Sequence, residues 1–217
     1  MEFNYIEDGI DAVVIDNFYT EEQLSKIMDE LKFLTRKEIF VQPEDLASAE
    51  NDHGALASKT GVFLETVFLN WKHSGLIAYP IENFSKKEVK DKLLGYNSLF
   101  RIMYHSDCRS HLLSYYQNSD FYKPHVDITA FTILNYFYTE PKKFKGGSIK
   151  LYSSNSNKEA VIEIKQNRVV LFPGCTFHEV LPIESNETDS YTGNGRYCNS
   201  IFLNLRGDPP LKETKQK

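Results

Sequence analysis

The second half of the chain is a succession of short apolar runs separated by turn-forming residues. The runs are rich in β-branched and aromatic side chains, which favour strands. They cover residues 111–117, 125–128, 131–139, 147–153, 159–164, 168–172, 177–182 and 196–205. Turn signals separate them at Pro141, Gly146-Gly147, 153–157, Gln166-Asn167, Pro173-Gly174 and 193–195. Eight short strands with regular turns predict a double-stranded β-helix, that is, a jelly-roll or cupin-like barrel.

The first half of the chain adds helices to this pattern. An apolar run at 12–16 predicts a strand, and Thr20-Glu21-Glu22-Gln23 has the spacing of a capping box with Thr20 as the N-cap. Apolar residues then recur at helical spacing and predict a buried stripe of Leu24, Ile27, Met28, Leu31 and Leu34. Helical patterns follow at 81–84 and 86–94, whereas 100–104 resembles a strand. The predicted fold class is therefore mainly β with flanking helices (α+β).

Charge and composition argue against several classes of protein. The chain has 217 residues and a formal net charge of −5, whereas a general nucleic-acid binder usually presents a basic face. No apolar run is long enough to span a bilayer, and the N-terminus lacks the basic flank and apolar core of a signal peptide. The three cysteines lack the spacing of metal-binding pairs, so we expect reduced thiols in a cytoplasmic protein. The sequence leaves the oligomeric state open.

The triplet His125-Val126-Asp127 indicates a metal site. In an extended strand, residues two positions apart face the same side, so the imidazole and the carboxylate would point the same way. His178, after the Pro173-Gly174 turn, is the candidate for a third ligand. Two histidines and one carboxylate form a facial site that leaves coordination positions open on non-haem Fe(II). The structural alternatives are a surface His–Asp pair and a core histidine that bonds to the backbone.

The residues around this triplet follow a recognisable order. Tyr116 and Tyr122 precede His125, Pro124 adjoins it, and a Gly146-Gly147 turn, His178 and then Arg196 follow. Over residues 111–206 this order resembles the Fe(II)/2-oxoglutarate-dependent dioxygenase superfamily, in particular its prolyl 4-hydroxylase-like group. The resemblance implies that the triad holds a catalytic Fe(II), with 2-oxoglutarate as co-substrate, O2 as oxidant and ascorbate as a candidate reductant.

The resemblance also implies a pocket for the co-substrate. Arg196 and the Tyr116 hydroxyl are expected to hold the C5 carboxylate of 2-oxoglutarate, Arg196 through two parallel hydrogen bonds. Tyr122 is expected to face the substrate. Three residues that alternate along one strand are expected to line the co-substrate pocket: Thr132, Leu134 and Tyr136.

Two features depart from the family pattern. Arg196 lies eighteen residues after His178, farther than is usual in the family, because of an insertion at 184–194. Cys198 stands where many relatives carry Ser. The alternative for Arg196 is a surface salt bridge, but it opens an apolar strand after a glycine-rich turn, from which a guanidinium can point into the barrel.

The resemblance implies hydroxylation of an unactivated C–H bond, and we expect the target to be a prolyl or other amino-acid residue in a peptide or protein. Asp127 favours hydroxylation over halogenation, because halogenases of this family lack the carboxylate ligand. One alternative is a hydroxylase of a free amino acid or other small molecule. Another is a cupin-like metal enzyme that does not use 2-oxoglutarate, which would need no anchor such as Arg196 or Tyr116. The intact ligand set argues against a non-catalytic binding module.

We therefore expect one oxygenase domain over residues 1–217. Residues 1–110 would provide helical support and loops on the substrate side, 111–206 the catalytic jelly-roll core, and 207–217 a charged tail. The polar segments 41–60 and 184–195 are rich in turn formers, and we expect both to be mobile loops at the mouth of the site.

Overall fold

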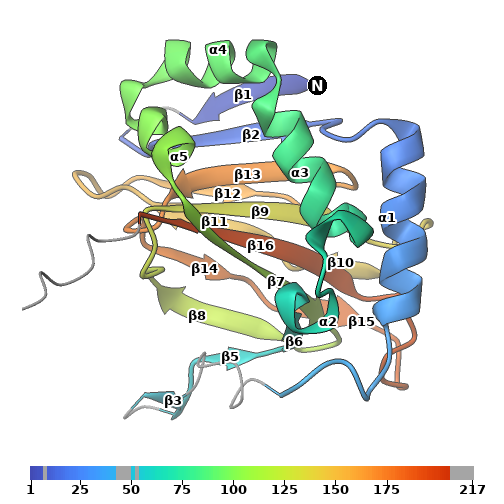
Figure 1. Cartoon of the computed structure of the whole chain (residues 1–217). Helices are drawn as coiled ribbons and strands as arrows, with labels where there is room; N and C mark the ends of the chain where they lie inside the picture. Colours follow the sequence, from blue (N-terminus) through green and yellow to red (C-terminus); the bar gives the residue numbers. More distant parts are fainter. Residues whose placement is uncertain (7–8, 43–49, 52–53, 206–217) are drawn as a thin grey trace, which may run out of the picture.

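The computed structural model describes residues 1–6, 9–42, 50–51 and 54–205, and they form three layers (Figure 1). A seven-stranded sheet is the middle layer, with a five-stranded sheet on one side of it and helices on the other (Figure 1). This arrangement follows from the sequence, because a sheet that is apolar on both faces must be covered on both.

The first half of the chain supplies the helices and several short strands. The helices are α1 (Glu21–Leu34), α2 (Leu64–Val67), α3 (Gly75–Ser85), α4 (Lys87–Tyr96) and α5 (Arg101–His105), with the 3-10 turns η2 (Trp71–His73) and η3 (Ser98–Phe100). The strands are β1 (Glu2–Ile6), β2 (Ala12–Asp16), β3 (Glu50–Asn51), β4 (Gly54–Ala55), β5 (Ala57–Ser58) and β6 (Thr60–Phe63). The second half continues with β7 (Cys108–Tyr116), β8 (Phe121–His125), β9 (Phe131–Phe137), β10 (Phe144–Gly146), β11 (Ile149–Tyr152), β12 (Glu159–Ile162), β13 (Arg168–Pro173), β14 (His178–Val180), β15 (Ile183–Ser185) and β16 (Arg196–Asn204).

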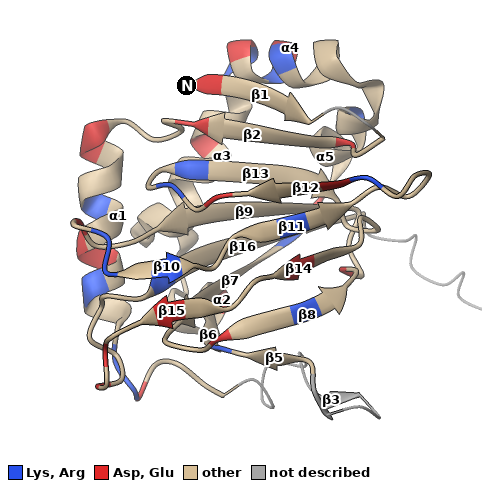
Figure 2. Ribbon diagram, turned by 180° about the vertical axis from the view of Figure 1, so that it is seen from behind, with Lys and Arg blue, Asp and Glu red and all other residues tan. Residues whose placement is uncertain are grey.

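The two main sheets are antiparallel and face each other. The larger has the order β1-β2-β13-β9-β16-β7-β6, and the smaller has the order β12-β11-β14-β8-β5. All seven residues of the central strand β9 are buried and none is charged, so its ribbon in Figure 2 has a single colour. Within the described residues the sheets are not hydrogen-bonded into a closed barrel, so this jelly roll is an open sandwich.

Alternation along the strands of the larger sheet divides the interior into two cores. On β13, Val169 and Leu171 pack in the core under the helices, whereas Val170 and Phe172 pack in the core between the sheets. The same division separates Tyr115, on the helix side of β7, from its neighbour Tyr116, on the inner side. Side chains that could serve a site between the sheets must therefore come from alternate positions of these strands.

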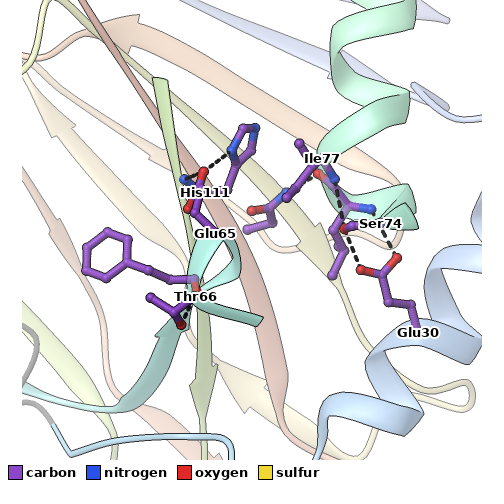
Figure 3. Close-up of polar contacts among 9 residues, drawn as sticks. Glu30, Glu65, Thr66, Ser74, Ile77 and His111 are labelled. Atoms are coloured by element: carbon purple, nitrogen blue, oxygen red, sulfur yellow. Dashed lines mark hydrogen bonds and ion pairs between the residues drawn. The ribbon is translucent and has the colours of Figure 1, made fainter. Parts of the chain in front are cut away.

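Two carboxylates join the helix layer together and to the sheet (Figure 3). Glu30 of α1 accepts hydrogen bonds from Ser74 Oγ at 2.5 Å and from the Gly75 N–H at 2.7 Å, so it caps the N-terminus of α3. Glu65 of α2 accepts a hydrogen bond from the backbone N–H of His111 at 2.9 Å and lies 2.7 Å from its Nδ1. These contacts join α1 to α3 and α2 to β7 (Figure 3).

Most of the local expectations are confirmed. The fold is mainly β with flanking helices. Thr20 and Gln23 form the capping box of α1, and Ile27, Leu31 and Leu34 are buried on one side of that helix. Strands occur near each predicted run in the second half, and β10 and β15 are further strands that the sequence did not suggest.

Two local expectations are wrong. Residues 100–104 are helical: Asn97 caps the 3-10 turn by accepting from the Leu99 N–H at 2.9 Å, and Phe100 and Met103, one turn apart, are both buried. The strand expected at 125–128 ends at His125, because its neighbour β14 begins at His178, the register partner of His125. Asp127 is therefore not on the same strand as His125.

Part of the chain lies outside the described residues. This applies to the expected tail, 207–217, and to 43–49 and 52–53 of the expected loop at 41–60. Within the described ranges, no helix combines the length and the apolar character that a membrane crossing requires.

Candidate metal centre

His125, Asp127 and His178 come together between the two sheets. Each offers one ligand atom, and these atoms lie within 4.8 Å of one another. His125 ends β8 and His178 begins the adjacent β14, so strand pairing places the two imidazoles side by side, with ring centroids 4.2 Å apart. Asp127 reaches the same point from the turn after β8, with its two carboxylate oxygens 3.6 Å from His125 Nε2 and 3.6 Å from His178 Nε2.

Both imidazoles are held in the form that can bind a metal. His125 Nδ1 lies 2.7 Å from the Lys123 carbonyl oxygen, and His178 Nδ1 lies 2.8 Å from the Thr176 carbonyl oxygen. Because a carbonyl oxygen can only accept, each Nδ1 carries the proton and each Nε2 keeps its lone pair free for a metal. Burial lowers the pKa of His125 to about 4 and also lowers the pKa of His178, so both rings are neutral near pH 7.

The Asp127 carboxylate is oriented by its neighbours. Thr132 Oγ1 donates a hydrogen bond to Asp127 Oδ2 at 2.6 Å, and the Asp127 N–H donates to the Gly174 carbonyl at 2.9 Å. Glycine is required at position 174, because a Cβ there would lie 2.2 Å from the Thr129 carbonyl oxygen. The Thr132 side chain thus contacts a candidate metal ligand, Asp127.

Aromatic rings flank the two histidines. Tyr122, three residues before His125, stacks on its imidazole with ring centroids 3.7 Å apart and an angle of 16° between the planes. Phe172 of β13 meets His178 edge-on at 4.8 Å. The rings restrict the rotation of both imidazoles and exclude water from one side of each.

Arg196 is the second notable feature of this region. The side chain has 0% of its surface exposed, and none of its three guanidinium nitrogens has a hydrogen-bond partner within the described part of the chain. Its guanidinium carbon lies 4.3 Å from the Tyr116 ring centroid and 4.9 Å from that of Tyr136. The Tyr136 hydroxyl is also buried without a partner. Unpaired buried donors of this kind fit an anionic ligand with several acceptor atoms.

The segment before Arg196 is anchored to β7 despite its length. The Tyr115 hydroxyl accepts hydrogen bonds from the N–H groups of Gly193 at 3.1 Å and Gly195 at 3.0 Å. A Cβ at Gly195 would lie 2.3 Å from the Tyr116 carbonyl oxygen, so only glycine permits this approach. The pairing of β16 with β7 then places Arg196 opposite Tyr116. The insertion therefore does not displace Arg196 from the inner face of the larger sheet.

One cavity connects the metal-ligand candidates with the guanidinium. Of the residues expected to bind co-substrate or substrate, Tyr116, Tyr122, Leu134 and Arg196 line this cavity, whereas Thr132 and Tyr136 lie behind it against Asp127 and Arg196. The described lining comprises Lys59, Tyr116, Tyr122, His125, Asp127, Leu134, His178, Val180, Arg196, Cys198, Ser200 and Phe202.

Lys59 is a further functional candidate, which no sequence pattern indicated. It is only 6% exposed and lies in the cavity, with its ammonium 4.6 Å from the Tyr122 ring centroid. Burial lowers the pKa of Lys59 to about 8. A single lysine in a polar segment carries no periodic or motif signal, so the sequence offered no means of selecting it.

Comparisons with known proteins agree with this geometry. A family model described as the 2OG-Fe(II) oxygenase superfamily matches residues 110–203, the part of the chain that carries the triad and Arg196. No curated protein matches the sequence.

Solved structures resemble the fold. A prolyl-4-hydroxylase from Pseudomonas putida superposes with a TM-score of 0.57 at 13% identity, covering 91% of this chain and 94% of that one. A prolyl hydroxylase from Trichoplax adhaerens, in complex with a hypoxia inducible factor peptide fragment, gives 0.59 at 18% identity and covers 88% and 82%. A prolyl 4-hydroxylase from Phytophthora capsici gives 0.57 at 20% identity and covers 91% of this chain and 60% of that one.

At these sequence identities the solved structures show a shared fold only. The family model adds a sequence match to the superfamily over residues 110–203. The cavity geometry agrees with both, since two histidines, one carboxylate and an unpaired arginine share a single chamber. Residues 110–203 thus match the 2OG-Fe(II) oxygenase superfamily, and the chain has the fold of the solved prolyl 4-hydroxylases.

Proposed function

We propose that this oxygenase hydroxylates an unactivated C–H bond in a prolyl or other amino-acid residue of a peptide or protein. His125, Asp127 and His178 would hold Fe(II). The proposal rests on one observation: the same cavity holds three candidate metal-ligand atoms and a buried guanidinium without a hydrogen-bond partner among the described residues. Iron supplies the oxidative chemistry when bound: O2 converts 2-oxoglutarate to succinate and CO2, and one oxygen atom enters the substrate as the hydroxyl group.

The residues present fit this metal. Two neutral imidazoles with free Nε2 atoms and one carboxylate form the donor set that suits Fe(II) and leaves positions open for other ligands. Hydrogen bonds with the Thr132 hydroxyl and with the carbonyls of Lys123 and Thr176 orient the three candidate ligands. The protein's part is thus to fix the ligand geometry before the metal arrives.

The residues at the other end of the cavity fit 2-oxoglutarate. Arg196 would bind the C5 carboxylate, with the Tyr116 and Tyr136 rings packed around its guanidinium. The unpaired Tyr136 hydroxyl would offer a further donor, which extends the role expected from the sequence, where Tyr116 was assigned that hydrogen bond. A cupin-like enzyme that does not use 2-oxoglutarate would have no evident need for such an anchor.

Two observations support a peptide substrate. The Trichoplax adhaerens relative is described in complex with a peptide fragment. Tyr122, which stacks on His125 and remains half-buried at the cavity, offers an aromatic surface on which a substrate ring can pack. A free amino acid remains the alternative substrate class.

The proposed co-substrate chemistry can be tested without knowing the substrate. Fe(II) and 2-oxoglutarate should be added to the protein in the absence of oxygen, and the weak visible absorption band of the two bound together should be recorded. We expect this band for the wild-type protein and not for Asp127→Ala, which lacks one ligand. A wild-type protein that binds Fe(II) but develops no band with 2-oxoglutarate would contradict the assignment.

The substrate class needs a second experiment. Proline-containing peptides and free amino acids should be compared as stimulants of succinate formation, with product mass measured in parallel. Stimulation with a mass gain of about 16 Da, the mass of one oxygen atom, in a peptide would support the proposal. Oxidation of free amino acids alone would favour the alternative.

A further inference from the structure

Lys59 lies where the chain passes from one sheet to the other. It is the single residue between β5 and β6. Strand β5 pairs with β8, which carries His125, and β6 pairs with β7, which carries Tyr116. Since β5 and β6 are the edge strands of their sheets, Lys59 is built into the wall of the cavity on the side where the sheets are joined.

The surroundings of Lys59 lack a matching anion. Within the described residues its ammonium faces aromatic rings, at 4.6 Å from the Tyr122 centroid and 5.8 Å from the Tyr116 centroid, and no carboxylate forms an ion pair with it. Among the described lining residues Asp127 is the one carboxylate, and it accepts a hydrogen bond from Thr132 and is itself a candidate metal ligand. A buried ammonium normally has an anionic partner, so the expected partner is a ligand.

The two cations of the cavity stand at different places along it. Arg196 packs against Tyr116 and Tyr136, whereas the ammonium of Lys59 is nearest to Tyr122, the ring that stacks on His125. Lys59 is therefore at the end that holds the metal ligands. A ligand with one carboxylate near the metal and a second one near Arg196 would match both charges.

We propose that Lys59 binds the C1 carboxylate of 2-oxoglutarate, the one beside the keto group, while Arg196 binds the C5 carboxylate. This inference rests on the proposed use of 2-oxoglutarate by the same site. It assigns each carboxylate of the dianion to its own buried cation, and it gives the segment before β6 a direct part in binding the co-substrate.

The test compares two 2-oxo acids that differ at the distal end. 2-Oxoglutarate carries both carboxylates, whereas 2-oxovalerate lacks the C5 carboxylate and keeps the C1 carboxylate and the keto group. Dissociation constants should be measured by calorimetry on protein loaded with Mn(II), which avoids oxidation during the titration. The proteins are wild type, Lys59→Met, Lys59→Arg and Arg196→Met, with Lys145→Met as the control for loss of an exposed lysine on β10.

We expect Lys59→Met to weaken both 2-oxo acids by a similar factor of about 30 or more, because truncation of one partner leaves a buried charge unpaired. Lys59→Arg should recover part of the affinity for both, since it keeps the charge. Arg196→Met should weaken 2-oxoglutarate alone, and Lys145→Met should change neither. The Mn(II) affinity of Lys59→Met should be kept or raised, which shows that the cavity is intact. If Lys59→Met does not fold, Lys59→Gln replaces it in the same comparison.

Two outcomes would overturn the assignment. If loss of the lysine weakens 2-oxoglutarate but not 2-oxovalerate, Lys59 serves the C5 carboxylate. If it weakens neither, Lys59 does not bind the co-substrate. Failure of the wild-type protein to bind either 2-oxo acid would instead contradict the proposed function itself, so the two failures are distinguishable.

Discussion

Replacing Arg196 by methionine should stabilise the metal-free protein and should lower the affinity of the metal-loaded protein for 2-oxoglutarate. The guanidinium is fully buried, and its three nitrogens have no hydrogen-bond partner within the described residues. In the absence of a ligand, folding therefore removes this charge from water with little compensation. Methionine fills a similar volume without any charge to desolvate.

The magnitude follows from two opposing terms. Burial of an ion costs several kcal/mol in real proteins, whereas the contacts of the guanidinium with the Tyr116 ring at 4.3 Å and the Tyr136 ring at 4.9 Å return roughly 0.5–2 kcal/mol each. By analogy with buried ionic groups replaced by apolar residues, we expect a gain of about 1–4 kcal/mol in the free energy of unfolding. Each kcal/mol raises the Tm of a domain of this size by about 2–4 °C.

The ligand should shift the difference in stability back toward the wild-type protein. At a concentration of 100 times its Kd, 2-oxoglutarate stabilises the wild-type protein by about 2.7 kcal/mol. Loss of the arginine leaves the C5 carboxylate unpaired and costs about 2–5 kcal/mol of binding, which is a loss of affinity of roughly 30-fold or more. The same ligand concentration should therefore stabilise Arg196→Met very little. The affinity of Arg196→Lys for 2-oxoglutarate should lie between those of the two proteins, because lysine keeps the charge and loses the planar fork.

The assay is urea unfolding of both proteins, first with a metal chelator and no carboxylate in the buffer, then with Mn(II) and 2-oxoglutarate. The free energies of unfolding are compared at equal m-values, so that a change in compactness is not mistaken for a change in stability. A metal-free Arg196→Met protein that is less stable than wild type, and that still gains the full stabilisation from 2-oxoglutarate, would refute this reasoning. The anchor would then be another group.

Three further predictions follow from contacts in the structure. Thr132→Val removes the hydrogen bond to Asp127 and should weaken Mn(II) binding by about 10–100-fold in a titration, with the fold unchanged. Asp16 accepts two hydrogen bonds from Arg168, and the hydrogen bond from Arg168 holds the pKa of Asp16 below its usual value. Its contribution to stability should be present above the unfolded pKa of about 3.9 and lost as pH falls through the folded pKa. Asp16→Asn should thus cost about 1.5–3 kcal/mol in urea unfolding at pH 7 and flatten the acid dependence, and an unaltered acid limb would count against the pair. Finally, amide hydrogen exchange in 184–195 should slow when Mn(II) and 2-oxoglutarate bind, because this segment leads into the co-substrate anchor, and unchanged exchange would argue against a lid.

The cavity between the sheets illustrates how much local sequence patterns can predict. Tyr116, Leu134 and Arg196 were expected in it, and all three line it. Alternation along a strand is a local property, so the inner or outer face of each position can be read from the sequence once the strand is recognised. Thr132 and Tyr136 lie on the expected face but behind the lining, against Asp127 and Arg196. The depth of a side chain depends on its neighbours, which sequence alternation does not specify.

The candidate metal ligands come together as expected, although the local reason given for this was wrong. The sequence placed His125 and Asp127 on one strand, whereas the strand ends at His125 and the turn after it delivers Asp127. The two residues still converge because the backbone of Asp127 is bonded to Gly174, in the turn that leads to His178. That contact joins segments almost fifty residues apart in the chain, so no local pattern could report it.

The sequence by itself determined the kinds of group at the site and their order: two histidines, one carboxylate, and an arginine after a glycine-rich turn. It also determined the strand-rich second half and the capped helix at Thr20, because periodicity and capping depend on neighbours within a few residues. The tertiary structure decided the rest. It brought Lys59 into the cavity through the edge strands of two sheets, tied the insertion before Arg196 to Tyr115, and left the jelly roll open. These outcomes depend on which distant strands pair and in which register, and register is set by the packing of whole faces against one another.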